Sequence, residues 1–493
     1  MNRADQLAEL FATSVWRVDR AGPALRTQLY RQLRDAVAEG RLAPGAPVPS
    51  SRMLARALRV SRSTLVEALE QLRVEGYLDA RQGATTRVAA LEPGHLLRPP
   101  ATTGPAGAHA PAADATSPLW VQDDPPMAVT LRAFRPGLPD LRAFPGREWA
   151  THLGRRSRQP ASHDLSYAAC TGVPALREQI IRHVAQTRHV AARADQVIVV
   201  PSAQAAFDIV LRCCARPGDT AWIEDPGYPG MRTLLRAHGL HAVPKAVDAE
   251  GLLPEPGPHQ LPRVIYLTPS HQYPTGATLS LQRRLALLEI ARTSGAAIIE
   301  DDYDSEFQSH GQPIASLQGL DRQGCVHYVG TFSKTLAPGL RCAYLIVPPA
   351  YARLAETVAS AAGVGVPIHV QLALADFMAD GGLRRHIHRM RSAYAARLGL
   401  LHDTLRQSGA GRIVPLRAAG GLQLCAALQI GLGDVEAAQR LRGQGLHAVP
   451  LSSLAHGPVW QGRQGLLLGI GLVALDEVAP QARRLCQALL PAG

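Results

Sequence analysis

One lysine is the first side chain of this sequence that could do chemistry. The chain holds 50 arginines but only two lysines, and one of these, Lys334, lies in the Ser/Thr-rich run GTFSKTLAPGLR at 330–341. Arginine replaces lysine at most surface and phosphate-binding positions, but it cannot form a Schiff base with an aldehyde because its guanidinium stays protonated. Lys334 in this run therefore suggests a site for pyridoxal 5'-phosphate (PLP). From composition alone, a surface lysine is an equal alternative.

A PLP site also needs a carboxylate for the ring nitrogen, a donor to the phenolic oxygen and a ring to stack on the cofactor. Asp301 and Asp302 follow the apolar run 297–299, and a carboxylate at the end of a strand can keep the ring nitrogen protonated. We expect Asp301 in this role, with Asp302 as the alternative, and Tyr303 at the phenolic oxygen. Tyr228, in a loop after another apolar run, is expected to stack on the ring.

The fifth requirement is a phosphate cup. The run PSAQ at 201–204 joins a predicted strand to a predicted helix, and the free N–H groups at a helix N-terminus bind anions. Hydroxyl and guanidinium donors near the lysine can complete the cup. The predicted cofactor contacts are Ser202, Ala203, Gln204, Tyr228, Asp301, Tyr303, Thr331, Ser333, Lys334 and Arg341.

The elements that precede this region predict three helices and a two-stranded wing between residues 20 and 90. Apolar residues at four-residue spacing from Leu25 to Val37 predict an amphipathic helix that Gly40 ends. Two further helices and two short strands follow. They are a helix capped within 49–51 that carries Leu54 and Leu58, a helix from Ser61 that buries Leu65 and Leu72, and strands at 77–79 and 86–88.

This arrangement is a winged helix-turn-helix, whose second helix enters the DNA major groove. Residues 20–90 carry twelve arginines against six acids, half of the chain's formal charge of +12. Such an excess favours binding to a polyanion, although charged surface is often only solvated. We expect Ser61 to cap its helix and also to contact DNA, with a cap alone as the alternative, and we expect Arg62 to contact DNA. The predicted DNA contacts are Ser50, Ser51, Arg52, Ser61, Arg62, Ser63 and Thr64.

The rest of the chain divides into a linker and an α/β domain. Residues 91–127 are rich in Pro, Ala, Gly and Thr, which predicts a flexible linker. After it, short apolar runs alternate with helical stretches, which predicts parallel strands covered on both faces. The seven cysteines show no metal-like spacing, the N-terminus has no apolar signal core, and the uncharged run 358–375 is broken by Gly and Pro. We therefore expect a cytoplasmic protein.

The N-terminal part resembles the GntR family of winged-helix regulators. The runs that carry the resemblance are QLYRQL at 28–33, APG at 43–45, PSSR at 49–52, VSRST at 60–64 and EGYL at 75–78. The wing departs from the family pattern Gly-Ser-Gly-Thr-Tyr-Val, since this chain has GATTRV at 83–88. The departure concerns the contact of the wing with the minor groove and leaves the fold expectation unchanged.

The C-terminal part is similar to fold type I aminotransferases, and the whole chain resembles MocR-type regulators, in which both parts are fused. Further runs that match this group are TPSHQYPTG at 268–276 and LRRHIHRMR at 383–391. The resemblance implies a multidomain protein, a PLP cofactor, a homodimer and two DNA half-sites. The expected domains are a winged helix-turn-helix at 20–90, the linker at 91–127 and an aminotransferase-like domain at 128–493, with a large part at about 160–350 and a small part at about 375–493.

One departure bears on activity. Aminotransferases hold the substrate carboxylate with an arginine in the final strand, and Leu467 lies at the matching place in GLLLGI at 465–470. Without that clamp an amino acid is poorly oriented for transamination. We therefore expect a PLP-dependent transcriptional regulator that responds to a small-molecule effector. The alternatives are an active aminotransferase with an appended DNA-binding module, and a DNA-binding protein whose large domain only dimerises.

Overall fold

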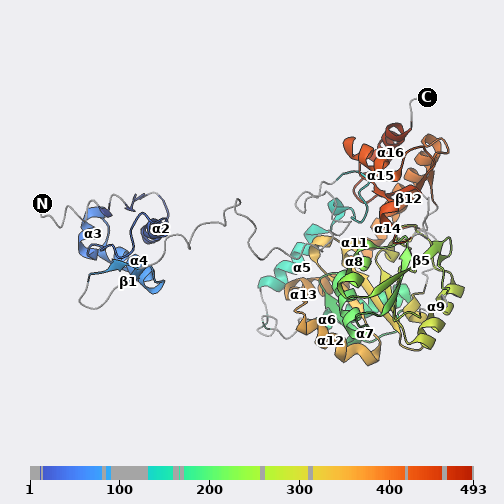
Figure 1. Ribbon diagram of the computed structural model, residues 1–493, viewed down its shortest axis with the longest axis horizontal. Helices are drawn as coiled ribbons and strands as arrows, with labels where there is room; N and C mark the ends of the chain where they lie inside the picture. Colours follow the sequence, from blue (N-terminus) through green and yellow to red (C-terminus); the bar gives the residue numbers. More distant parts are fainter. Residues whose placement is uncertain are drawn as a thin grey trace. The chain divides into compact units, whose positions relative to one another are not determined.

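The computed structural model describes twelve stretches of the chain, which divides into two compact units at residues 1–116 and 117–493 (Figure 1). The predicted linker and the tip of the predicted wing, residues 80–84, lie outside these stretches, as does Cys170. Among the described residues, no helix has both the length and the apolar character needed to cross a membrane. The described stretches are 11–12, 15–20, 22–79, 85–89, 132–158, 161, 166, 171–255, 261–308, 315–416, 420–457 and 464–490.

The first unit confirms the predicted order of three helices and two strands. Its elements are α2 (Leu25–Ala38), α3 (Ser51–Leu58), α4 (Arg62–Val74), β1 (Leu78–Asp79) and β2 (Arg87–Val88). The strands pair in antiparallel register, with Leu78 opposite Val88. Leu33, Leu54 and Leu65 come from different helices and are all fully buried in one apolar cluster. The leucine spacing of the sequence thus determines which helix faces form the core.

A tight turn between α3 and α4 determines where α4 begins. Arg59 ends α3 in the left-handed conformation, with φ of 53°, and Val60 N–H donates to the carbonyl of Ala55 at 3.1 Å. Ser61 then caps α4, because its Oγ accepts a hydrogen bond from Thr64 N–H at 3.1 Å. The N-terminal residues of α4 are held at the surface by this turn.

The second unit is built on an eight-stranded sheet with the order β3-β10-β9-β8-β7-β4-β5-β6. The run from β9 to β5 is parallel, whereas β10 is antiparallel to both of its neighbours and β6 to β5. The strands are β3 (Val197–Val200), β4 (Thr220–Asp225), β5 (His241–Asp248), β6 (Gly251–Leu252), β7 (Val264–Leu267), β8 (Ala297–Asp302), β9 (Val326–Thr331) and β10 (Ala343–Ile346). The prediction of parallel strands is thus confirmed for β7 and β8, whereas the predicted strand β3 pairs antiparallel with β10.

Helices cover both faces of this sheet, as expected for strands that read as continuous apolar runs. Successive residues of β3 face opposite sides, so Ile198 and Val200 join one buried cluster while Val197 and Val199 join another. The helices of the unit are α5 (Gly146–Arg158), α6 (Pro174–Arg188), α7 (Ala203–Cys214), α8 (Pro229–Ala237), α9 (Leu281–Ser294), α10 (Leu317–Leu320), α11 (Phe332–Thr335), α12 (Ala352–Ala361), α13 (Ile368–Ala379), α14 (Gly382–Ser408), α15 (Asp434–Gly443) and α16 (Leu475–Leu489).

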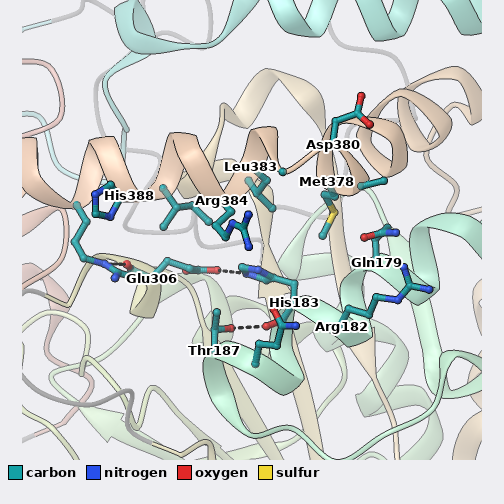
Figure 2. A pocket seen from close by; sticks show the side chains of 15 residues that line it. Gln179, Arg182, His183, Thr187, Glu306, Met378, Asp380, Leu383, Arg384 and His388 are labelled. Carbon is teal, nitrogen blue, oxygen red and sulfur yellow. Dashed lines mark hydrogen bonds and ion pairs between the residues drawn. The ribbon is translucent and has the colours of Figure 1, made fainter.

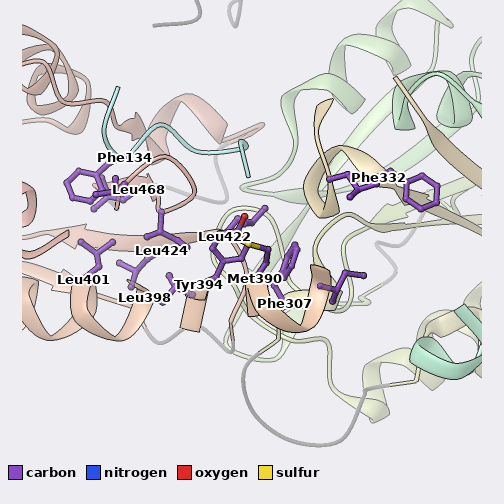
Figure 3. Close-up of a cluster of buried hydrophobic side chains, with 14 of the residues drawn as sticks. Phe134, Phe307, Phe332, Met390, Tyr394, Leu398, Leu401, Leu422, Leu424 and Leu468 are labelled. Atoms are coloured by element: carbon purple, nitrogen blue, oxygen red, sulfur yellow. The ribbon is translucent and has the colours of Figure 1, made fainter. Parts of the chain in front are cut away.

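A smaller antiparallel sheet follows along the chain, with the order β11-β12-β14-β13. Its strands are β11 (Ile413–Pro415), β12 (Gln423–Leu428), β13 (Val449–Pro450) and β14 (Gly465–Gly469). Leu398 and Leu401 of the long helix α14 pack toward Leu424 and Leu468 of this sheet (Figure 3). The same apolar cluster continues to Phe332 beside the large sheet, so one core joins the two sheets.

Candidate cofactor pocket and nucleic-acid interface

A cavity of about 330 Å³ gathers every side chain that the sequence predicts around Lys334. The contributing segments follow β3, β4, β8 and β9, and these four strands point in the same direction, so their carboxyl ends share one edge of the sheet. The ten predicted residues that line the cavity are Ser202, Ala203, Gln204, Tyr228, Asp301, Tyr303, Thr331, Ser333, Lys334 and Arg341.

Lys334 lies in the short helix α11, directly after β9, and its Nζ donates a hydrogen bond to the carbonyl of Gly137. Burial lowers the pKa of the Lys334 ammonium, although the carboxylates of Asp304 and Asp301 raise it. The net shift is downward, which makes the neutral amine, the nucleophilic form, more accessible than in a solvated lysine. Gly137 comes from a segment nearly 200 residues earlier, and the sequence analysis did not identify it.

Asp301 and Asp302 are adjacent in β8 and therefore point to opposite faces of the sheet. Asp301 lines the cavity and accepts a hydrogen bond from Tyr266 Oη at 2.7 Å. Burial raises the pKa of Asp301 to about 7, against the hydrogen bond from Tyr266 that lowers it. Asp302 does not line the cavity, because its carboxylate binds Arg188. Of the two carboxylates that the sequence left open, only Asp301 faces Lys334.

Tyr303 is oriented by a buried histidine that the sequence analysis did not single out. Its hydroxyl lies 3.2 Å from Nδ1 of His271, and the two rings are stacked with centroids 5.9 Å apart. The same Nδ1 contacts both carboxylate oxygens of Asp304 at 2.9 Å. Burial lowers the pKa of His271, but the charge and hydrogen bond of Asp304 outweigh it, so the pKa is raised. His271 and Asp304 thus form a buried ion pair that supports Tyr303.

The residues predicted for the phosphate cup lie at two helix N-termini, together with Arg341. Ser202 caps α7 by accepting from Ala205 N–H at 3.2 Å, and Thr331 caps α11 by accepting from Ser333 N–H at 3.1 Å. The first N–H groups of a helix have no backbone partner inside it, so at the start of α7 those of Ala203 and Gln204 are available to an anion, whereas that of Ala205 is engaged by Ser202. Arg341 lines the same cavity, and its guanidinium has no hydrogen-bond or ion-pair partner among the described residues.

Tyr228 lies between β4 and α8, at the N-cap position of α8. Its hydroxyl accepts a hydrogen bond from Gln204 Nε2 at 3.2 Å, and its ring meets that of Tyr273 edge-on at 5.9 Å. Gly230 permits this arrangement, because a Cβ there would lie 2.2 Å from Gln204 Nε2 and 2.7 Å from the Tyr228 ring. The close approach explains why this turn carries glycine.

The predicted DNA contacts lie at the N-termini of α3 and α4. Arg52 and Arg62 are exposed, and neither has a partner in the described part of the chain. Arg73, at the other end of α4, is instead paired with Glu70 at 2.5 Å. Unpaired guanidinium groups at a helix N-terminus are available to bases and phosphates.

The serines of these two helix starts differ in their bonding. Ser61 Oγ is engaged within its own helix, since it also contacts Ser63 Oγ at 2.9 Å and Thr64 Oγ1 at 2.7 Å. Ser50 occupies the N-cap position of α3, but its side chain makes no capping hydrogen bond. Ser51 follows it as the first residue of that helix.

Comparison with known proteins agrees with this pairing of parts. Residues 25–88 match the model of bacterial regulatory proteins of the gntR family, and residues 149–460 match that of class I and II aminotransferases. The chain is 36% identical over 447 residues to the probable rhizopine catabolism regulatory protein MocR of Rhizobium meliloti, covering 90% of each chain. The chain belongs to the MocR-type regulators of the GntR family. Another relative of this MocR-type chain is the pyridoxine biosynthesis regulator PdxR of Corynebacterium glutamicum, which is 34% identical and covers 81% of this chain and 82% of its own.

Solved structures resemble the aminotransferase-like part of this MocR-type chain. The α-aminoadipate aminotransferase LysN of Thermus thermophilus, complexed with N-(5'-phosphopyridoxyl)-L-leucine, has 26% identity and a TM-score of 0.66. The match covers 73% of the MocR-type chain and 92% of LysN. PLP is the cofactor of this aminotransferase family, and the cavity fits it, since the unpaired Arg341 and the α7 N-terminus lie around the same space as Asp301 and Lys334.

Leu467 is the residue that the sequence analysis matches to the substrate-binding arginine of aminotransferases. It is fully buried in β14 opposite Cys425 and packs with Leu451 in a small apolar cluster. Tyr273 packs against this cluster and also lines the cavity. Leu422 and other residues that the sequence analysis missed line the cavity as well. The missed lining residues are Gly137, Phe207, Tyr266, Tyr273, Pro338, Leu422 and Gln423.

A larger space of about 560 Å³ lies between α6 and the start of α14 and contains none of the predicted site residues. Figure 2 shows polar side chains of the two helices facing one another across it, with Glu306 reaching toward His183. We call it the α6–α14 groove. The polar residues that line it are Gln179, Arg182, His183, Gln186 and Thr187 of α6, Arg384, His388 and Arg391 of α14, and Glu306 and Asp380.

Proposed function

We propose that this protein is a PLP-dependent transcriptional regulator in which ligand binding at Lys334 controls the binding of DNA or the activation of a promoter. The observation that carries the proposal is the convergence of all ten predicted cofactor residues on one cavity, in a chain that also carries a GntR-type module with unpaired arginines. A ligand that binds one state of the larger unit more tightly shifts the protein toward that state. If the two states also differ in their affinity for DNA, the ligand changes DNA binding by linkage.

Each cavity residue has a defined task in this proposal. When bound, PLP would supply an aldehyde for the Lys334 amine and a ring that accepts electrons. Lys334 Nζ would hold the cofactor, and its lowered pKa makes the neutral amine more accessible for this purpose. Asp301 holds a proton at the ring nitrogen, and Tyr303 donates to the phenolic oxygen. Tyr228 covers the ring. The remaining predicted contacts bind the phosphate, and they are Ser202, Ala203, Gln204, Thr331, Ser333 and Arg341.

The partners that follow from this proposal are double-stranded DNA, a small-molecule effector and a second copy of the chain. Arg62 reads a base in the major groove, while Arg52 and the hydroxyls of Ser50, Ser51, Ser63 and Thr64 contact phosphates. A homodimer would present two winged helices to two half-sites. Residues 20–90 form the DNA-binding domain, residues 91–127 the linker and residues 128–493 the aminotransferase-like domain, and the protein acts in the cytoplasm.

A working aminotransferase is the alternative, and the position of Leu467 disfavours it. The side chain is fully buried among apolar neighbours behind Tyr273, so it offers no charge to a substrate carboxylate. Multiple-turnover assays with a panel of amino acids and keto acids test the alternative. Sustained turnover would favour the enzyme.

The test of the cofactor assignment uses the two lysines of the chain. Lys334→Ala should abolish the visible absorbance of bound PLP and its fixation by borohydride, while leaving non-specific DNA affinity largely unchanged. Lys245→Ala is the matched control, because Lys245 lies over the Trp222 ring at 4.0 Å and outside the cavity. Unchanged absorbance in Lys334→Ala, or equal loss in both variants, would contradict the assignment.

A further inference from the structure

The α6–α14 groove combines basic residues from two helices on facing surfaces. On α14, Arg384, His388 and Arg391 follow one another at spacings of four and three residues, which places them on one side of the helix. On α6, Arg182 and His183 face them across the groove. Donors from two separate elements therefore converge on one space of about 560 Å³, within the usual range for small-molecule sites.

The arginines of the groove have unused donor capacity. Arg384 has no hydrogen-bond or ion-pair partner among the described residues. Arg391 Nε–H donates a hydrogen bond to the carbonyl of Glu306 at 2.7 Å. The terminal nitrogens of Arg391 have no hydrogen-bond or ion-pair partner within the described stretches. Arg182 has only a loose pair with Glu178, at 3.5 Å and with both side chains more than half exposed.

The acids of the groove do not neutralise these arginines. Glu306 lies 3.6 Å from His183, and Asp380, at the far end, lies 3.6 Å from His152. The Arg384 guanidinium and the terminal nitrogens of Arg391 thus remain for a ligand, and Arg182 is held only by its loose pair with Glu178. Guanidinium binds planar or tetrahedral oxyanions through paired N–H groups, so phosphate and carboxylate groups match it best.

We propose that the α6–α14 groove is a second ligand site, which binds a small molecule carrying two or more oxyanion groups and, through Glu306, changes the affinity of the Lys334 cavity for its ligand. The binding is independent of the function proposed above, whereas the coupling depends on it. Phosphorylated compounds and polycarboxylates share this chemistry.

A short segment connects the two sites. Glu306 belongs to the turn η4 (Ser305–Phe307), which Arg391 and His183 hold on the groove side. On the cavity side, Gly421 N–H donates to the carbonyl of Phe307 at 3.1 Å. Leu422 N–H also approaches Asp304 Oδ2 at 3.4 Å, and Leu422 lines the Lys334 cavity. An anion that draws Arg391 or His183 away from Glu306 would therefore move a segment that supports the cavity wall.

Calorimetric titration of the full-length protein tests the binding, with PLP in saturating amounts so that the phosphate cup is filled. We expect inorganic pyrophosphate or citrate to bind at one saturable site per chain, and Arg384→Gln to weaken binding about tenfold or more. Arg406→Gln is the matched control, because Arg406 is exposed near the other end of α14 and lies outside the groove. Tighter binding of pyrophosphate indicates a phosphorylated ligand, and tighter binding of citrate a polycarboxylate.

Three results would overturn the site. These are no saturable binding of either anion, equal weakening by Arg384→Gln and Arg406→Gln, or a loss of operator affinity in anion-free Arg384→Gln as large as that in Arg62→Ala. The last result would make the groove a DNA contact.

The coupling is tested by the dissociation constant of PLP, measured from its absorbance with and without pyrophosphate. We expect a change of about fivefold or more in the parent protein, and no change in Arg384→Gln. A change that persists in the variant reflects competition at the phosphate cup and overturns the coupling. Failure of PLP to bind would refute the proposed function, while the titration of pyrophosphate into the groove still decides the second site.

Discussion

Arg188 Nε lies 2.7 Å from Oδ2 of Asp302, and both side chains are almost wholly buried. Tyr328 Oη donates to the same oxygen at 2.5 Å. Arg188 is the last residue of α6 and Asp302 is the last residue of β8, so this ion pair connects α6 to the large sheet. It also turns Asp302 away from the cavity that its neighbour Asp301 lines, which gives two adjacent carboxylates different tasks.

Replacement of the two carboxylates should therefore have separable effects. Asp302→Ala removes the buried carboxylate that pairs with the Arg188 guanidinium, and we expect it to lower the free energy of unfolding by about 3–5 kcal/mol. Asp301→Asn should change this free energy less and instead weaken the binding of PLP. Urea unfolding of the cofactor-free proteins and titration with PLP measure the two effects. Equal destabilisation by both substitutions would contradict this division.

The raised carboxyl pKa values predict a pH dependence of stability. Burial raises the pKa of Asp301 and of Glu224 to about 7, so between pH 4 and pH 7 the folded state binds more protons at these groups than the unfolded state does. Their stabilising contribution is complete below pH 4 and is lost as the pH rises through 7. Between pH 5.5 and pH 7.5, cofactor-free Asp301→Asn should lose less stability in urea than the parent protein. An identical loss would show that Asp301 is already ionised at pH 5.5.

The two serine N-caps of the DNA-binding unit should differ in their contribution. Ser61→Ala removes the hydrogen bond to Thr64 N–H and should reduce the local stability of α4 by about 1 kcal/mol. Ser50→Ala should change α3 less, because the Ser50 side chain makes no capping bond. Amide hydrogen exchange of the first turns of both helices, in the full-length protein, measures the difference. Equal protection changes would show that Ser61 acts in another way.

Arg62 should contribute to sequence preference and Arg73 should not. Arg62→Ala should lose roughly 1–3 kcal/mol of discrimination between an operator selected from random duplexes and an unrelated duplex. Arg73→Ala is the control on the same helix, because Arg73 is already paired with Glu70. Fluorescence anisotropy on both duplexes measures the effect, and equal preference in parent and Arg62→Ala would show that another residue reads the operator.

Salt dependence is expected as well. Neutralisation of six to ten phosphates would reduce affinity roughly 10³–10⁵-fold between 50 and 200 mM salt. The same anisotropy titrations, repeated at four or five salt concentrations, give the slope. A flat dependence would show that few phosphates are contacted.

Local patterns predicted those features that depend on local contacts. Leucines at four-residue spacing determine the buried faces of α2 and α4, and short apolar runs determine β3, β7 and β8, because in these cases side-chain period and backbone geometry are coupled. The segments that follow the central strands could be placed at one edge for the same reason. The ten predicted cavity residues come from these segments.

Contacts between residues that lie far apart in the sequence could not be predicted in this way. Gly137 and Gln423 reach the cavity from segments far from Lys334 in the chain, and neither lies in a pattern that indicates a site. The reversed direction of β10 depends on pairing with β3 and β9, which a local apolar run does not specify. The sequence does point to the region of His271, because the run 268–276 matches the MocR-type group. Its pairing with Asp304, however, depends on the fold and could not be predicted from the sequence.

Gln423 Nε2 lies 3.4 Å from Tyr303 Oη, and these residues belong to β12 of the small sheet and to the segment after β8 of the large one. The Lys334 cavity is therefore bounded by two sheets that meet across it. One apolar cluster also joins the two sheets, so an occupant of the cavity contacts both parts of a continuous core. We therefore expect the size of the occupant to affect how Gln423 packs against Tyr303.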